Sequence, residues 1–159
     1  MTVLQPRKNV VAVLAFAALL PATAALAELG GSVSSVQVEQ SRMRAGLRRV
    51  EAGNYTRHEL SLPNGGSVHE FSNSGGQVFA VVWHGPGKPD LRSLLGAHFA
   101  TFQAEAAPGN GRGPHFRRRP MQVNHSDLQI RTGGHMGYFW GVAYLPAQLP
   151  SGFNTNALQ

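Results

Sequence analysis

The stretch from Val78 to Asp90 constrains the fold more than any other part of this chain. Its first six residues, Val78 to Trp83, are all apolar and do not alternate with polar ones. An uninterrupted apolar run of this kind is typical of a strand that is covered on both faces. Glycines and prolines between Gly85 and Pro89 then end the strand, and Asp90 is a good helix N-cap. We therefore expect a buried central strand, with Trp83 in the core, followed by a helix.

Upstream of this strand the apolar spacing predicts a helix over 36–50. Ser34 or Ser35 can cap it, and one helical stripe holds Val36, Met43, Leu47 and Val50. Three antiparallel strands are then predicted at 55–62, 67–71 and 77–83, joined by turns rich in asparagine and glycine.

The register of the first hairpin has two readings. A loop of Asn64 and Gly65 would place Glu59 opposite Glu70, which is an unfavourable pair of like charges. A loop of Gly65 and Gly66 places Leu60 opposite Phe71 instead, and we favour this second register.

The second half of the chain repeats the pattern of helix and strands. Apolar residues recur at helical spacing from Leu91 to about Ala106, and a flexible basic loop is expected near 107–122. Strand patterns return from about Val123, a Gly133–Gly134 turn follows, and a long closing strand is predicted over 135–145, with a tail behind it. The predicted fold is α+β: an antiparallel meander of about five strands, with an N-terminal helix and a second helix after the third strand.

The first 27 residues predict an export leader. Arg7 and Lys8 precede an apolar segment from Val10 to Leu20, and Ala25–Leu26–Ala27 is a small-x-small cleavage site. This is the pattern of a secretory signal peptide, and its apolar core is shorter than the ~20 residues that a transmembrane helix needs. We expect a periplasmic or secreted product of residues 28–159, with no transmembrane segment after cleavage and one domain.

Composition narrows the chemistry. The chain has no cysteine, which excludes disulfides, thiolate metal sites and a cysteine nucleophile. Its formal net charge of +6 includes two basic residues of the leader, so the exported product keeps a smaller surplus, clustered at Arg117–Arg118–Arg119. Such a surplus favours anionic partners such as acidic lipid headgroups or polysaccharides, whereas nucleic acid is not expected outside the cytoplasm.

No catalytic or metal-binding constellation stands out. Glu59 and Glu70 are candidates for an acid–base pair if the hairpin brings them together, although exposed strand residues are the simpler interpretation. None of the seven histidines is paired at helical metal-ligand spacing; His58 and His69 are the candidates for a strand-to-strand site. We predict no catalytic residues, metal or cofactor, and keep a small hydrolase and a periplasmic metal-binding protein as alternatives.

The candidate binding residues lie in two short blocks that contain glycine and histidine. The first is His84–Gly85–Pro86, at the end of the central strand. The second is Gly133–Gly134–His135–Met136, at the turn before the closing strand, where a turn does not require large side chains. The candidates are His84, Pro86, His135 and Met136, with the loop residues Arg117, Arg118 and Arg119 in addition.

The same two blocks carry a family resemblance. The segment Val78 to Pro86, with Pro89–Asp90–Leu91 and Leu94–Leu95–Gly96, resembles one block of a family of short exported proteins of Gram-negative bacteria. That family is known as domain of unknown function 2844. Its second block resembles Gly133–Gly134–His135–Met136 followed by 141–146, and Leu29–Gly30–Gly31 also fits. The resemblance implies export and a single domain, and it brings no activity. We therefore expect a non-enzymatic binding protein with an unidentified partner in the envelope or outside the cell.

Overall fold

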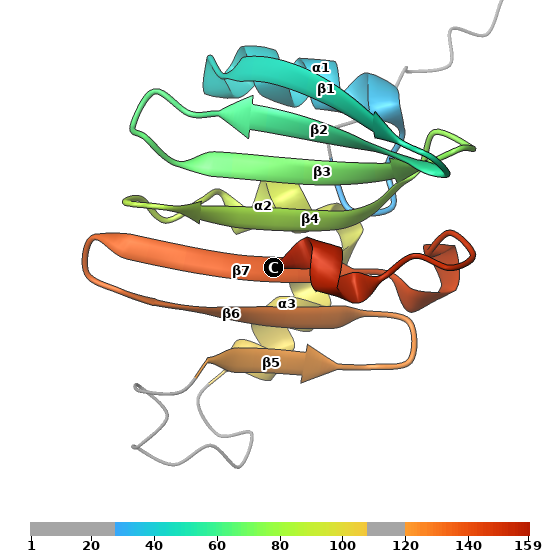
Figure 1. Ribbon diagram of the computed structural model, residues 1–159. Coiled ribbons are helices and arrows are strands. Elements are labelled where there is room, and N and C mark those ends of the chain that lie inside the picture. Colours follow the sequence, from blue (N-terminus) through green and yellow to red (C-terminus); the bar gives the residue numbers. More distant parts are fainter. Residues whose placement is uncertain (1–27, 108–119) are drawn as a thin grey trace, which may run out of the picture.

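The protein is built on one antiparallel sheet of seven strands. The computed structural model describes residues 28–107 and 120–159, and the strand order is β1-β2-β3-β4-β7-β6-β5 (Figure 1). The strands are β1 (Gly46–Ala52), β2 (Tyr55–Ser61), β3 (Ser67–Asn73), β4 (Val78–Gly85), β5 (Met121–Asn124), β6 (Gln129–His135) and β7 (Tyr138–Tyr144).

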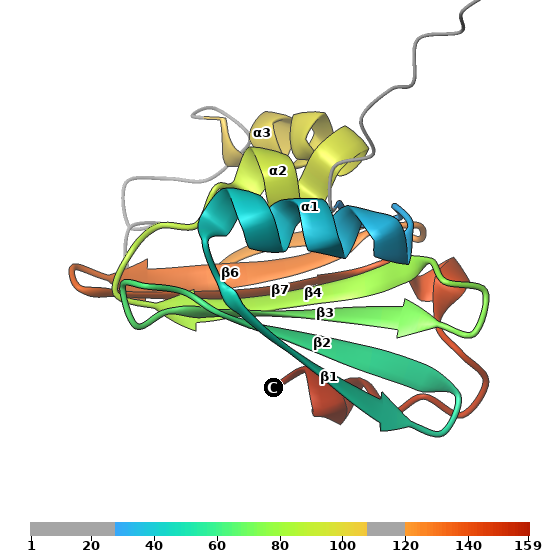
Figure 2. The ribbon, with the colours of Figure 1, turned by 90° about the horizontal axis from the view of Figure 1, so that it is seen from above.

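The three α-helices of the described residues lie on one face of this sheet. They are α1 (Val33–Met43), α2 (Leu91–Leu95) and α3 (Phe99–Ala106), with the 3-10 turn η1 (Gly96–His98) between the last two. Figure 2 shows the helices above the sheet and the C-terminal segment, with the 3-10 turns η3 (Pro146–Gln148) and η4 (Thr155–Leu158), on the opposite side. The α+β class with an antiparallel sheet is thus confirmed.

Strand β4 is the central strand, as its apolar run predicts. It pairs with β3 on one side and β7 on the other, and it has core on both faces. Val81 and Trp83 pack under the helices, and Trp83 is only 2% exposed. Phe79 and Ala80 point the other way, because a register irregularity opposite Phe71 and Ser72 makes neighbouring residues share that face.

The predicted helix over 36–50 is wrong in its second half. Helix α1 ends at Met43, where Arg44 takes a left-handed conformation (φ 51°), and residues from Gly46 onward form the edge strand β1. Spacings of three and four residues fit a helical stripe, but Leu47 and Val50 lie on opposite faces of a strand. Pairing along the whole length of β2 supplies the backbone hydrogen bonds that a helix would otherwise provide.

The sheet therefore has seven strands rather than about five. The two missed strands are β1, which had helical spacing, and β5, which is only four residues long. As a result the second helical segment follows the fourth strand, not the third. It is also broken at Gly96, whose φ is 50° and whose Cβ position is filled by the Glu28 side chain.

Both readings of the first hairpin are wrong. Leu60 pairs with Val68, and a five-residue loop over 62–66 connects the strands. The Leu62 amide donates to the Gly66 carbonyl, and the Asn64 side chain accepts from the Gly66 amide, so hydrogen bonds within the loop close it. The resulting register places Glu59 opposite His69 and avoids the like-charge pair.

The turn between β6 and β7 is also displaced from its predicted position at Gly133 and Gly134. Gly133 and Gly134 lie inside β6, and the turn is formed by Met136 and Gly137. A Cβ on Gly133 would stand 2.9 Å from the Trp140 ring, so this glycine makes room for an indole rather than for a turn. His135 is consequently the last residue of β6.

The C-terminal residues do not form a loose tail. Leu158 is buried, and the Phe153 ring packs edge-on against Phe79 with centroids 4.9 Å apart and against Tyr55 at 5.0 Å. This segment builds a second, smaller core on the face of the sheet opposite the helices.

Candidate functional site

The face of the sheet opposite the helices, here called the open face, is only partly covered. The C-terminal segment covers its centre near Phe71, Phe79 and Ala80. Side chains alternate along each strand, so the register defines which residues point to this face. One row across the sheet contains Arg48, Glu59, His69, Val82, Val142, Arg131 and Gln122.

An aromatic hollow of about 320 Å³ lies on the open face beside this row. Trp140 is placed there because Gly133 on the neighbouring strand has no side chain, so the indole lies over its backbone. The Arg131 guanidinium sits over the Trp140 ring, 5.6 Å from its centroid, in cation–π geometry. Tyr138, which is 43% exposed, and His84 line the same hollow.

A second hollow of similar volume adjoins the first and has a different lining. The two share Arg131, Val142, Leu158 and Gln159. Most of the remaining side chains of the second hollow are polar and uncharged, and include Gln122, Asn124, Gln129 and Thr155. Together the hollows offer an aromatic platform, a set of amides and one guanidinium between them.

The open face carries a surplus of positive charge. The described strands turn three arginines, Arg48, Arg57 and Arg131, and one glutamate, Glu59, toward it. Glu59 is bound by Arg57 at 2.6 Å and approached by Arg48 at 3.6 Å. Arg131 has no ion-pair partner among residues 28–107 and 120–159, so its charge is the one left available.

Two histidines extend this surface across the sheet. His69 and His84 approach edge to face, with ring centroids 6.0 Å apart. Burial lowers the pKa of His69, against the opposing influence of Glu59. The His84 Nε2 lies 2.8 Å from the Ser67 Oγ. This contact joins β3 to β4, and among the described residues no carboxylate hydrogen-bonds His84.

The structure brings the two predicted blocks to one end of the sheet. His84 pairs with Trp140, and Phe139 lies between Gly85 and Gly134. His135 points to the open face and stacks on Tyr138 with ring centroids 6.2 Å apart. Met136, at the tip of the hairpin, is 95% exposed.

The other predicted positions contribute less. Pro86 is exposed beyond the end of β4, outside both hollows. Arg117, Arg118 and Arg119 lie outside the described residues. Conversely, sequence reasoning missed Arg131 and Trp140, although the alternation of Gln129, Arg131 and Gly133 marks the side of β6 that does not face the helices.

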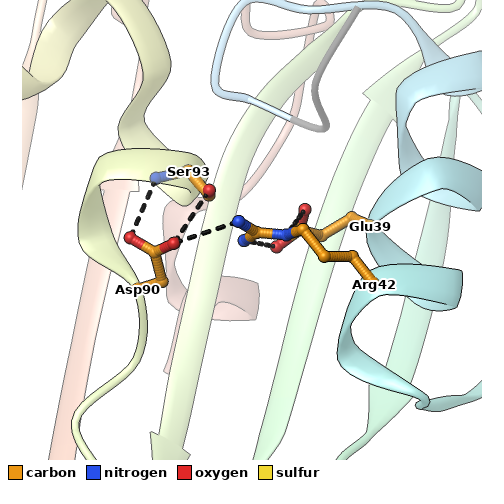
Figure 3. Close-up of polar contacts among 4 residues, drawn as sticks. All are labelled: Glu39, Arg42, Asp90 and Ser93. Carbon is orange, nitrogen blue, oxygen red and sulfur yellow. Dashed lines mark hydrogen bonds and ion pairs between the residues drawn. The ribbon is translucent and has the colours of Figure 1, made fainter.

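The face of the sheet that the helices cover, here called the covered face, has a polar cluster made of Glu39, Arg42, Glu70, Asp90 and Ser93. Glu39 on α1 and Glu70 on β3 are both fully buried. Arg42 binds the Glu39 carboxylate through Nε at 3.0 Å and reaches Asp90 at 3.1 Å, and Asp90 in turn accepts from the Ser93 hydroxyl and amide (Figure 3). This chain of contacts ties α1 to the start of α2.

Glu70 is the exception in this cluster. Neither oxygen of its carboxyl has a hydrogen-bond partner among the described residues. Burial, reinforced by the negative charge of Glu39, raises the pKa of Glu70 to about 8, so the carboxyl is mostly neutral at pH 7. The expectation that Glu70 is an exposed strand residue is therefore wrong.

The register separates the pairs on which the alternative functions depend. Glu59 pairs with His69 and His58 with Glu70, so Glu59 faces the open side while Glu70 faces the helices. The two histidines are divided in the same way. In the described part of the chain, no group of three or more histidine, aspartate or glutamate side chains is placed to hold a metal ion.

Comparison with known proteins gives one match. Residues 25–158 match the family described as "Protein of unknown function (DUF2844)". The chain belongs to this family. No curated protein and no solved structure matches it. Among the described residues of this family member, no helix is long and apolar enough to cross a membrane.

Proposed function

We propose that this protein is an exported, non-enzymatic binding domain whose open sheet face binds an anionic component of the cell envelope or its surroundings. The observation that carries the proposal is the Arg131 guanidinium, held over Trp140 in a solvent-open hollow and without a carboxylate partner in the described chain. A partly exposed aromatic ring beside an unpaired cation is not needed merely to cover the sheet.

The composition of the two faces supports the same assignment. On the helix side Glu70 is buried, and Glu39 and Asp90 are paired with Arg42, whereas the open face combines three arginines with one glutamate and three histidines. Net positive potential over a hollow attracts anionic groups and raises their local concentration. Export is inferred from the leader pattern in residues 1–27, and the intact mass of the product should then correspond to Glu28–Gln159.

The binding proposal is tested by co-sedimentation of the protein with isolated envelopes. Arg131→Gln keeps a polar, planar end group on a shorter side chain but removes the charge, and it should lower the bound fraction several-fold. The matched control is Arg92→Gln, because Arg92 also lies over an aromatic ring, that of Phe99 at 4.7 Å, on the helix side. Equal binding by the wild type and both variants would refute the open face as the site.

A further inference from the structure

We infer that the two adjoining hollows bind an acidic polysaccharide, with a sugar carboxylate on Arg131 and neighbouring sugar rings on either side of it. This inference rests on the proposed function and specifies its ligand class. It follows from the way three kinds of side chain are distributed along one continuous depression.

The aromatic hollow suits the apolar face of a sugar ring. A pyranose presents C–H groups on its flat side, and these pack on an aromatic face, as other apolar groups do. Trp140 is held in place by the backbone of Gly133 below it. Tyr138 stands beside it, steadied by the stacked ring of His135. The platform is thus preformed, and binding does not have to order it.

The second hollow suits hydroxyl groups. Its lining includes the side-chain amides of Gln122, Asn124 and Gln129 and the Thr155 hydroxyl, and the Gln129 amide nitrogen already donates to the His125 carbonyl. Sugar hydroxyls also donate and accept, so such a lining can satisfy them wherever they fall. A lipid chain would displace water from the exposed Asn124 and Thr155 side chains without replacing its hydrogen bonds, which costs free energy.

Charge decides between a neutral and an acidic sugar. Arg131 lines both hollows, at their junction. A planar guanidinium binds a carboxylate through two parallel hydrogen bonds. A neutral polysaccharide crossing this junction would cover a cation without pairing it, which is unfavourable. The net positive open face adds long-range attraction to a polyanion, and His84 adds a further hydrogen-bonding group at the aromatic end.

The experiment compares oligogalacturonate with its methyl ester, using the 28–159 protein and calorimetry. The two ligands share backbone, length and hydroxyls and differ in the carboxylate charge. The acid form is expected to bind at least about tenfold more tightly than the ester. Arg131→Gln should abolish this difference, and Arg92→Gln should preserve it. Fluorescence adds an independent readout, because Trp140 is in the hollow while Trp83 is buried: Trp140→Phe should lose the intensity change on binding.

Two results would overturn the inference. One is equal affinity for acid and ester. The other is equally tight binding to a sulfated polymer, to duplex DNA or to vesicles with anionic lipid, which would indicate non-specific attraction. Failure of the ligand class is separable from failure of the function. If Arg131→Gln loses envelope binding and no oligogalacturonate binds, only the ligand class is wrong; if envelope binding does not depend on Arg131, the site itself is wrong.

Discussion

The two faces of the sheet differ in how far key ionisable side chains are exposed to solvent. Under the helices, Glu39 and Glu70 are removed from water completely, one paired with Arg42 and the other left to a raised pKa. On the open face, Arg131 and His84 remain exposed and contact a ring or a hydroxyl. Burial of a charge costs free energy that its partners must offset, so the first arrangement acts on stability and its pH dependence. The second leaves charge available to a ligand.

The largest test of this comparison uses the two tryptophans, one on each face. Trp83 lies over Gly141 beneath the helices, and Trp140 lies over Gly133 on the open side. Trp83→Ala should lower the free energy of unfolding by about 3–5 kcal/mol, because it leaves a large cavity in the main core. Trp140→Ala removes a half-buried ring and should cost about 1–2 kcal/mol. Denaturant titration measures both, and equal losses would show that the open-face tryptophan is a core residue too.

The central strand was readable from the sequence because its signal is local. Six apolar residues closed by glycine and proline have one reasonable interpretation, and Asp90 likewise caps α2 as its position predicts. The edge strand β1 was not readable, because the spacing of Met43, Leu47 and Val50 fits a helical stripe, whereas Leu47 and Val50 lie on opposite faces of the strand. Only pairing with β2 decides between them, and that pairing is a tertiary fact.

The proposed binding surface could be predicted only in part, for a related reason. The two glycine-rich blocks come together at one end of the sheet, with His84 and His135 on the open face. The role of Arg131, however, depends on which face the helices leave uncovered. That choice follows from the packing of α1, α2 and α3 on the same side, and alternation within β6 cannot reveal it.

The second test concerns pH and the covered face. The folded-state pKa of Glu70 is about 8, well above its ordinary value of 4.5, so the folded protein binds a proton that the unfolded chain releases. Stability contributed by this proton is complete below pH 4.5 and is lost as the pH rises toward 8. Between pH 6.5 and 8 the loss should be about 2 kcal/mol.

The histidines act in the opposite direction from Glu70. Burial and the charge of Arg49 lower the pKa of His58, and burial lowers that of His69, so stability linked to these histidines is lost as the pH falls through 6.5 and cannot produce a decline as the pH rises. Glu70→Gln should abolish the decline between pH 6.5 and 8 in denaturant titrations. Arg131→Gln, on the open face, should leave the decline unchanged. Persistence of the slope in Glu70→Gln would assign it to another group.

A smaller effect on the free energy of unfolding is expected at Asp90, the exposed end of the polar cluster on the covered face. Asp90 caps α2 through Ser93, and hydrogen bonds from Ser93 and Arg42 hold the pKa of Asp90 below its ordinary value despite partial burial. Asp90→Ala should cost about 1–2 kcal/mol through loss of the cap. Asp90→Asn retains a good capping residue but loses the exposed ion pair and one acceptor oxygen, so it should cost less than Asp90→Ala. Similar midpoints for the two variants in urea would mean that the charge, not the cap, stabilises this helix start.

The smallest effect on stability is expected at the tip of the hairpin formed by β6 and β7. Met136 is 95% exposed and His135 is exposed, with its Nδ1 2.9 Å from the Met136 carbonyl oxygen and its ring on Tyr138. Neither side chain fills core space, so His135→Ala and Met136→Ala should each change stability by less than about 0.5 kcal/mol. Gly137→Ala is the control within the same turn: its φ of +86° disfavours any side chain, and it should cost about 1–2 kcal/mol.

Thermal melting of these three variants separates the backbone from the side chains of the hairpin, and envelope co-sedimentation then separates His135 from Met136. Removal of the His135 ring leaves Tyr138 unsupported beside the aromatic hollow, so binding should weaken without a change in melting temperature. Met136 lines neither hollow, so its removal should change neither quantity. If Met136→Ala destabilises the protein as much as Gly137→Ala does, the exposed tip has a packing role and the contrast between the two faces does not extend to this hairpin.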